Sequence, residues 1–274
     1  MNRIAAIQLA SGPHVDANLL EVERLISEAT EHGASLVVLP ENFAMMGQSD
    51  DDFLTISEKL GDGKIQTFIA EQAKKHGIWI AAGTIPLKSG SKNKVLSSCL
   101  FYNDHGDQIG KYDKMHLFDV NLVDTNESYN ESETFTPGKK IVVIDTHLGR
   151  IGFTVCYDLR FPELYRSIIE QGADIILCPA AFTALTGKAH WTTLLRARAI
   201  ENLVYIIAAG QGGYHVSGRE THGDSMIVNP WGVILSRVAQ GSGVAIADID
   251  LDYSKELRKN FPCIDHRRIF CKIK

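Results

Sequence analysis

The sequence lacks the features that mark membrane, secreted and nucleic-acid-binding proteins. It contains no run of about 18 apolar residues, so it offers no transmembrane helix. Residues 1–6 lead directly into a strand pattern, without the long apolar segment of a signal peptide. The formal net charge of -5 gives no basic footprint for nucleic acid. We therefore expect a cytoplasmic protein that binds neither membrane nor nucleic acid.

Cysteine is also scarce. The 274 residues contain five cysteines, and an odd number without close pairing is typical of reduced thiols in the cytoplasm. Cys263, His266 and Cys271 lie near one another, but they lack the paired spacing of a zinc site. We therefore expect neither a disulfide framework nor a bound metal.

What is present is the composition of an ordinary globular protein, with 45% hydrophobic and 22% charged residues. Strand patterns alternate with helical patterns, and some strand pairs are joined by short turns, which indicates a mixed sheet. The strands are nearly continuously apolar and must be covered on both faces, as in two stacked sheets with helices outside. No linker rich in Pro, Gly or Ser interrupts the chain, so we expect a single domain over residues 1–274.

Periodicity and turn signals place the individual elements. Helices are predicted at 16–32, 64–76, 162–171, 188–202 and 253–260. Strands are predicted at 3–10, 35–39, 78–83, 95–103, 141–145, 150–155, 174–178, 203–208, 225–229, 233–236 and 244–248. Residues 112–138 are predicted as one long polar loop, and a loop of that length in a compact domain is usually functional.

One stretch combines a buried strand, a cysteine and the start of a helix. The apolar strand pattern ends at Val155, and Pro162 opens the following helix. Cys156 stands between them, where a helix N-terminus favours thiolate over thiol and so favours a nucleophile. For a cysteine considered alone, a buried structural role is the alternative.

Two other stretches place a charged side chain just after a strand. Glu41 follows the apolar run at 36–39. Lys114 lies just past another strand, which ends at residue 111. Taken singly, Glu41 would be a solvated loop carboxylate and Lys114 a surface charge. Together with Cys156, they supply the proton carrier, the cation and the nucleophile that amide hydrolysis by a cysteine requires.

Glu41, Lys114 and Cys156, in this order and each past the end of a strand, resemble the Glu-Lys-Cys arrangement of the nitrilase superfamily of carbon–nitrogen hydrolases. The resemblance covers nearly the whole chain. The motifs most similar to those of the Nit-type amidases are C-Y-D-L-R-F-P-E-L at 156–164 and N-P-W-G at 229–232. It implies a four-layer α-β-β-α sandwich and an amidase that needs no cofactor.

Each residue then has an expected role. Glu41 takes the thiol proton, passes it to the leaving ammonia and later activates water, and a raised pKa would suit this work. Lys114 stabilises the oxyanion, together with the backbone N–H of Tyr157, and lowers the pKa of the thiol. By resemblance a second glutamate supports the lysine. Glu131 is the best match, and Glu133 is a rival that the sequence leaves open.

The substrate is less closely defined. The resemblance is strongest to amidases of deaminated glutathione, a γ-amide of a 2-oxo acid, so that compound is the expected substrate. An ω-amidase acting on 2-oxoglutaramate, or a hydrolase of another small amide or N-carbamoyl compound, is the alternative. A non-catalytic scaffold of the same fold is a remote alternative, against which the intact Glu41, Lys114 and Cys156 argue.

Candidate substrate contacts lie on loops and at a helix start. They are Met45, Phe182, Thr183, Lys188, His190, Tyr214 and Arg219. Asp158 and Arg160, beside the nucleophile, are interpreted as an orienting ion pair or as a helix cap.

The family resemblance further implies a homodimer or a higher even oligomer. Apolar stripes on two helices favour such an interface, although an intramolecular core is the alternative. The stripes consist of Leu164, Ile168, Ile169, Trp191, Leu194 and Leu195.

Overall fold

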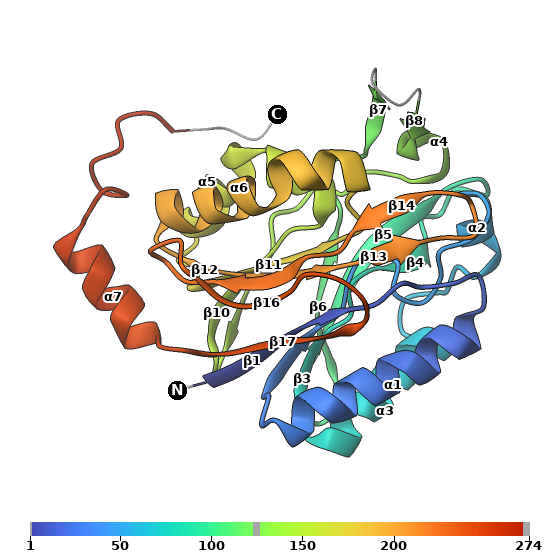
Figure 1. The fold of residues 1–274 in the computed structure, drawn as a ribbon, viewed down its shortest axis with the longest axis horizontal. Helices are drawn as coiled ribbons and strands as arrows, with labels where there is room; N and C mark the ends of the chain where they lie inside the picture. The colour runs from blue at the N-terminus through green and yellow to red at the C-terminus, as the bar shows by residue number, and fades with distance from the viewer. Residues whose placement is uncertain (1, 123–126, 271–274) are drawn as a thin grey trace.

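The computed structural model describes residues 2–122 and 127–270. Two β-sheets lie face to face (Figure 1). The helices of the described chain are α1 (Val15–Glu31), α2 (Asp52–Thr55), α3 (Lys64–His76), α4 (Glu131–Thr134), α5 (Pro162–Glu170), α6 (Ala184–Asn202) and α7 (Leu251–Asn260), with a short 3-10 helix η1 (Cys156–Arg160).

Both sheets mix parallel and antiparallel pairs, as expected. The first runs in the order β17 (Gly243–Ile249), β1 (Asn2–Gln8), β2 (Leu36–Val38), β3 (Trp79–Ala81), β5 (Val95–Tyr102) and β4 (Ile85–Lys88), and β6 (Gln108–Asp113) also pairs with β5. The second runs in the order β16 (Ile234–Val238), β15 (Ser225–Val228), β12 (Tyr205–Gly210), β11 (Ile175–Ala180), β10 (Gly149–Phe153) and β9 (Val143–Thr146).

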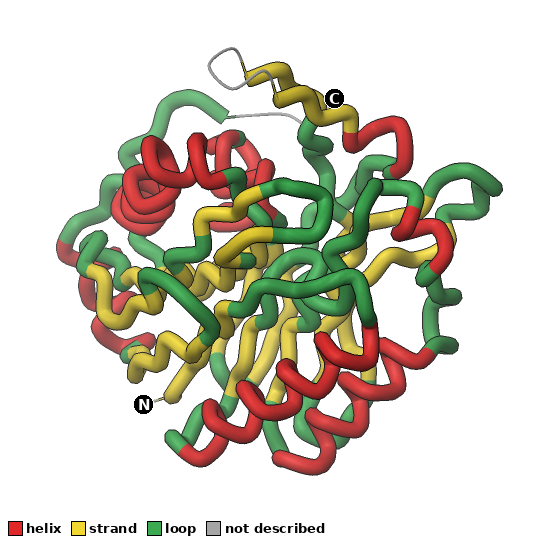
Figure 2. Tube along the Cα trace, turned by 45° about the vertical axis from the view of Figure 1, so that its right-hand side comes forward, coloured by secondary structure: helices red, strands yellow, loops and turns green. Residues whose placement is uncertain are grey.

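Helices cover the outer face of each sheet. α1 and α3 lie on one side of the stacked sheets, and α5 and α6 lie on the other (Figures 1 and 2). The predicted four-layer α-β-β-α sandwich is therefore confirmed. Within the described residues, no helix combines the length and apolar character needed to cross a bilayer.

The alternation of side chains along a strand explains why both faces are apolar. In β1, Ile4 and Ala6 belong to the core between the sheets, whereas Ala5 and Ile7 belong to the core beneath α1 and α3. Because successive side chains point to opposite faces, a strand covered on both sides must be apolar at every position. β2 divides its side chains between the same two cores.

The prediction of one long loop at 112–138 is wrong. This segment holds the end of β6, a small hairpin of β7 (Asp119–Leu122) and β8 (Glu127–Asn130), and α4. A second small hairpin pairs β13 (Gly212–Tyr214) with β14 (Glu220–His222), and residues of its turn line the same cavity as residues of β8. The predicted start of α6 at residue 188 is also late, because the Thr183 side chain caps the helix at Thr186 N.

The apolar stripes of α5 and α6 are used inside the molecule. Five of the six residues named for the interface are buried, and Leu194 is partly buried against the same core. The argument from these stripes for a dimer is therefore wrong, and the intramolecular alternative holds for them. Exposed apolar side chains lie elsewhere, notably at Ile200, Trp231 and Phe261.

Candidate active site

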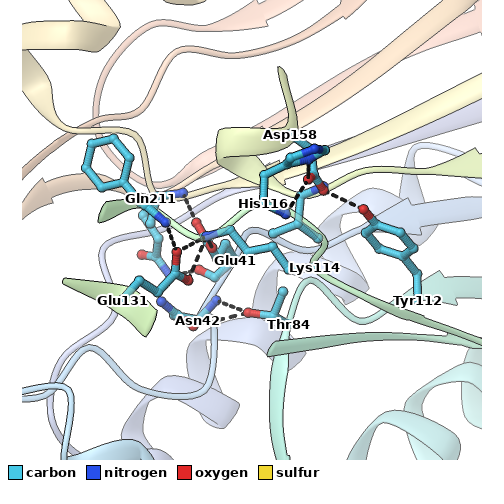
Figure 3. A network of polar contacts seen from close by, with 12 residues as sticks. Glu41, Asn42, Thr84, Tyr112, Lys114, His116, Glu131, Asp158 and Gln211 are labelled. Carbon is cyan, nitrogen blue, oxygen red and sulfur yellow. Dashed lines mark hydrogen bonds and ion pairs between the residues drawn. The ribbon is translucent and has the colours of Figure 1, made fainter. Parts of the chain in front are cut away.

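Glu41, Lys114 and Cys156 converge at one opening between the two sheets. Glu41 follows β2 and Lys114 follows β6, both in the first sheet, whereas Cys156 opens η1 after β10 of the second sheet. Lys114 Nζ lies 2.8 Å from Glu41 Oε1 (Figure 3). The Cys156 thiol lies close enough to the Glu41 carboxylate for each group to shift the pKa of the other. All three residues are buried, with exposed fractions of 2% to 7%.

The local backbone at Cys156 is strained. Cys156 has φ 50°, in the left-handed region that non-glycine residues rarely adopt, and such residues cluster at functional sites. The next residue, Tyr157, precedes the first hydrogen bond of η1, from Asp158 N to Val155 O. Its N–H therefore has no acceptor within the helix, which leaves it available for the predicted role of oxyanion donor.

Glu41 is held from several directions. Its Oε2 accepts a hydrogen bond from Ala181 N at 2.8 Å, and its backbone carbonyl accepts one from Gln211 Nε2 at 3.1 Å. Asn42, also left-handed at φ 56°, is fixed by two hydrogen bonds with Thr84. The carboxylate therefore has one oxygen on Lys114 and one on the backbone.

The supporting carboxylate next to Lys114 is Glu131. Its two oxygens accept hydrogen bonds from Lys114 Nζ at 2.7 and 2.8 Å, and Oε2 also accepts one from Phe118 N at 2.6 Å. The rival, Glu133, is exposed, and the described contacts of Lys114 do not include it.

Burial and charge set the protonation states. Burial opposes ionisation of Glu41, but the charge and hydrogen bond of Lys114 and the nearby Cys156 outweigh it, so the pKa of Glu41 is lowered. Burial, helped by the nearby Glu41 charge, raises the pKa of Glu131. For Lys114, burial acts downward, but Glu131 and Glu41 prevail and raise its pKa well above the usual value.

Two sequence expectations therefore fail. Burial and the negative charge of Glu41 raise the pKa of Cys156 well above that of a free thiol, whereas a lowered value was expected. The pKa of Glu41 is lowered, whereas a raised one was expected. At neutral pH the resting site thus holds a neutral thiol close to an ionised carboxylate, beside a protonated lysine.

These groups open into a cavity of about 430 Å³. Of the predicted substrate contacts, Phe182, Thr183 and Arg219 line it. Met45 lies instead in an adjoining apolar cluster, and its neighbour Met46 lines the cavity.

Three predicted contacts lie outside the lining of this cavity. Lys188 and His190 are on the exposed face of α6, and Tyr214 is 78% exposed on its hairpin. These three predictions are wrong because the exposure of a residue on a helix or hairpin depends on which face packs inward. The residue type alone does not determine that face.

Arg160 lines the cavity and was not among the predicted contacts. The expected ion pair with Asp158 does not form in the described structure. Arg160 donates to His190 Nδ1 at 3.2 Å, and its guanidinium lies 5.2 Å from the centroid of the Phe182 ring. The sequence feature that could have identified Arg160 is its position one short turn after Cys156, on the same helix η1.

Arg219 comes from the β13–β14 hairpin. It donates to Ala181 O, and its guanidinium lies 5.2 Å from the Tyr129 ring of the other hairpin. Its Nε is buried without a hydrogen-bond partner. A cation with an unused donor at a cavity wall is suited to an anionic ligand.

A family model described as carbon-nitrogen hydrolase matches residues 3–259. A protein of Synechocystis sp. named deaminated glutathione amidase is 43% identical over an alignment of 272 positions, which covers 96% of this chain and 97% of that protein.

Two solved structures share the fold. The C. elegans NitFhit protein aligns with a TM-score of 0.89 and 34% identity over 97% of this chain, which spans only 65% of that longer chain. Saccharomyces cerevisiae Nit3, described as a member of branch 10 of the nitrilase superfamily, aligns with a TM-score of 0.86 and 32% identity over 95% of this chain and 94% of its own.

The two glutamates give a matched test of the site. Glu131→Gln removes a charged partner from buried Lys114, and breaking a buried ion pair costs about 3 kcal/mol. We expect the free energy of unfolding, measured in urea, to fall by about that amount. We also expect the shape of the cavity to change. Glu133→Gln should leave unfolding unchanged. Equal effects of the two substitutions would contradict the assignment of Glu131.

Proposed function

Because the chain belongs to the carbon–nitrogen hydrolase family, and is therefore a hydrolase of amides rather than of peptide bonds, we propose that it cleaves the γ-amide of deaminated glutathione. The observation that carries this proposal is the ion pair of Lys114 with Glu41 and Glu131 beside the Cys156 thiol, inside a cavity lined by two arginines.

In the proposed first half-reaction, Cys156 Sγ attacks the amide carbonyl while Glu41 accepts its proton. The oxyanion forms beside Lys114 Nζ and the N–H of Tyr157, which stabilise the developing charge. Protonated Glu41 then donates to the departing nitrogen as the carbon–nitrogen bond breaks and a thioester remains. The neutral thiol of the resting site suits this order, because the base becomes protonated only when the sulfur attacks.

In the second half-reaction, Glu41 removes a proton from water, and the oxygen attacks the thioester carbonyl. The carbon–sulfur bond breaks, and the proton returns to Cys156. In deaminated glutathione the departing nitrogen is the amine of a dipeptide, whereas in 2-oxoglutaramate it is ammonia. The ammonia expected from the sequence therefore applies only to the alternative substrate.

The cavity supports the longer substrate. Deaminated glutathione carries two carboxylates and a thiol-bearing tail, and 2-oxoglutaramate is shorter, with one carboxylate. Two cavity-lining guanidinium groups, Arg160 on η1 and Arg219 on the hairpin, match the two carboxylates in number. The 430 Å³ volume falls within the range of sites that enclose such small molecules.

The direct test is hydrolysis of both 2-oxo amides by the purified protein, with Cys156→Ala beside it. We expect faster turnover of deaminated glutathione, and loss of all turnover in Cys156→Ala with unchanged circular dichroism, because only the sulfur is removed. Cys178→Ala, at another buried cysteine, is the control and should stay active. An active Cys156→Ala variant would refute the mechanism, and faster turnover of 2-oxoglutaramate would favour the ω-amidase.

Arg219 provides the test of substrate length. Arg219→Ala should raise KM for deaminated glutathione by about 10- to 100-fold, the loss of one charge-assisted hydrogen bond. The KM for 2-oxoglutaramate should change much less, because its single carboxylate needs only one arginine. Lys188→Ala, outside the cavity lining, is the control for charge. A similar increase for both substrates would remove Arg219 from the distal subsite.

We also propose that the protein forms a homodimer through an exposed apolar patch. Trp231 and Phe261 are 55% and 52% exposed, their ring centroids are 6.1 Å apart, and Ile200 is 46% exposed beside Gly232. A two-fold interface can pair such a patch with itself.

Light scattering tests this assembly. The wild type should have about twice the 30.2 kDa mass of the chain, and Trp231→Glu should dissociate it and lower its activity. Leu20→Glu, at a 68% exposed position on α1, should leave the dimer intact. A fully active wild-type monomer would exclude the dimer.

A further inference from the structure

A buried carboxylate joins the segment of Lys114 to the segment of Cys156. Asp158 has an exposed fraction of 0%, and its two oxygens accept four hydrogen bonds. Figure 3 shows Asp158 with Tyr112 and His116. A carboxylate buried this completely needs such partners to remain charged. The donors come from two separate parts of the fold.

The donors near Lys114 come from residues at equal distances before and after it in the sequence. Tyr112 OH donates to Asp158 Oδ2 at 2.6 Å, two residues before Lys114. His116 donates to Asp158 Oδ1 twice, from its backbone N at 3.1 Å and from Nδ1 at 2.6 Å, two residues after Lys114. Because a carboxylate only accepts, Nδ1 carries the proton.

On the cysteine side, the contact is made within the turn of the nucleophile. Val155 N donates to Asp158 Oδ2 at 2.8 Å, across the left-handed Cys156. The same carboxylate therefore closes the strained turn at Cys156 and fixes both sides of Lys114.

Two further contacts stiffen this link. The His116 ring stacks on Phe161, which follows η1, with centroids 3.6 Å apart and planes 7° apart. Burial, and then the charge of Asp158, raise the pKa of Tyr112 well above its usual value, so its hydroxyl stays a donor.

We propose that Asp158 is a positioning residue that sets the place of Lys114 opposite Cys156, without touching the substrate. The inference rests on the proposed amidase chemistry, in which Lys114 stabilises the oxyanion. Asp158 acts through its contacts with the chain on either side of Lys114 and with Val155, next to Cys156. It does not line the cavity. A misplacement of about 1 Å can cost about 10²-fold in rate, so small movements of Lys114 matter.

The test is Asp158→Asn, which keeps the size but offers one acceptor oxygen where four donors converge. We expect kcat to fall by about 10- to 100-fold for either 2-oxo amide, with KM changed less than about threefold. In a Lys114→Met background, the same substitution should cause no further loss, because the residue through which it acts is gone.

A substrate-free measurement separates this inference from the proposed function. Lys114 lowers the pKa of the Cys156 thiol, so displacing Lys114 should move the pH midpoint of Cys156 alkylation by iodoacetamide upward. Mass spectrometry of the Cys156 peptide separates this signal from that of the other cysteines, including Cys263, which is partly exposed. If Asp158 acted on the thiol only through its own negative charge, Asp158→Asn would instead move this midpoint downward.

Tyr112→Phe is the milder variant and carries the test if Asp158→Asn does not fold. It removes one donor and should lower kcat by roughly 2- to 10-fold, again only when Lys114 is present. Unchanged kcat in Asp158→Asn, equal losses with and without Lys114, or a downward alkylation shift would overturn the inference. A wild type inactive on both amides would refute the proposed function but leave the alkylation test standing.

Discussion

The site depends on one buried cation. Lys114 is 2% exposed, and burial of an unpaired ammonium would neutralise it, so its charge exists only because Glu41 and Glu131 lie within 2.8 Å. The carboxylates depend on the lysine in turn, because burial raises the pKa of both and the charge of Lys114 lowers it. The shared charge keeps Glu41 ionised while its neighbour, Cys156, stays protonated.

The stacking of the two sheets creates this arrangement. The strand ends that carry Glu41 and Lys114 belong to the first sheet, and the one that carries Cys156 belongs to the second. Neither sheet alone holds the three groups, so the apolar core between the sheets fixes the distance from cation to nucleophile. Asp158 adds a polar link between the same two layers.

Much of this could be read from the sequence, because it depends on local patterns. Continuous apolar strands predict sheets covered on both faces, and a charged residue just past a strand lies at a sheet edge. The pKa directions of Glu41 and Cys156 could not be predicted, since they depend on distances between segments more than 70 residues apart in sequence. The same is true of Arg160 and Tyr214, whose exposure is set by packing rather than by residue type.

Recognition and catalysis share a backbone segment. Ala181 donates its N–H to Glu41 Oε2, and its carbonyl accepts from Arg219 on the β13–β14 hairpin. Arg219 Nε is buried without a hydrogen-bond partner beside this segment. Because the resting thiol is protonated, the nucleophile forms only when Glu41 is correctly oriented. Ala181 is thus a direct contact between the cavity wall at Arg219 and the Glu41 carboxylate.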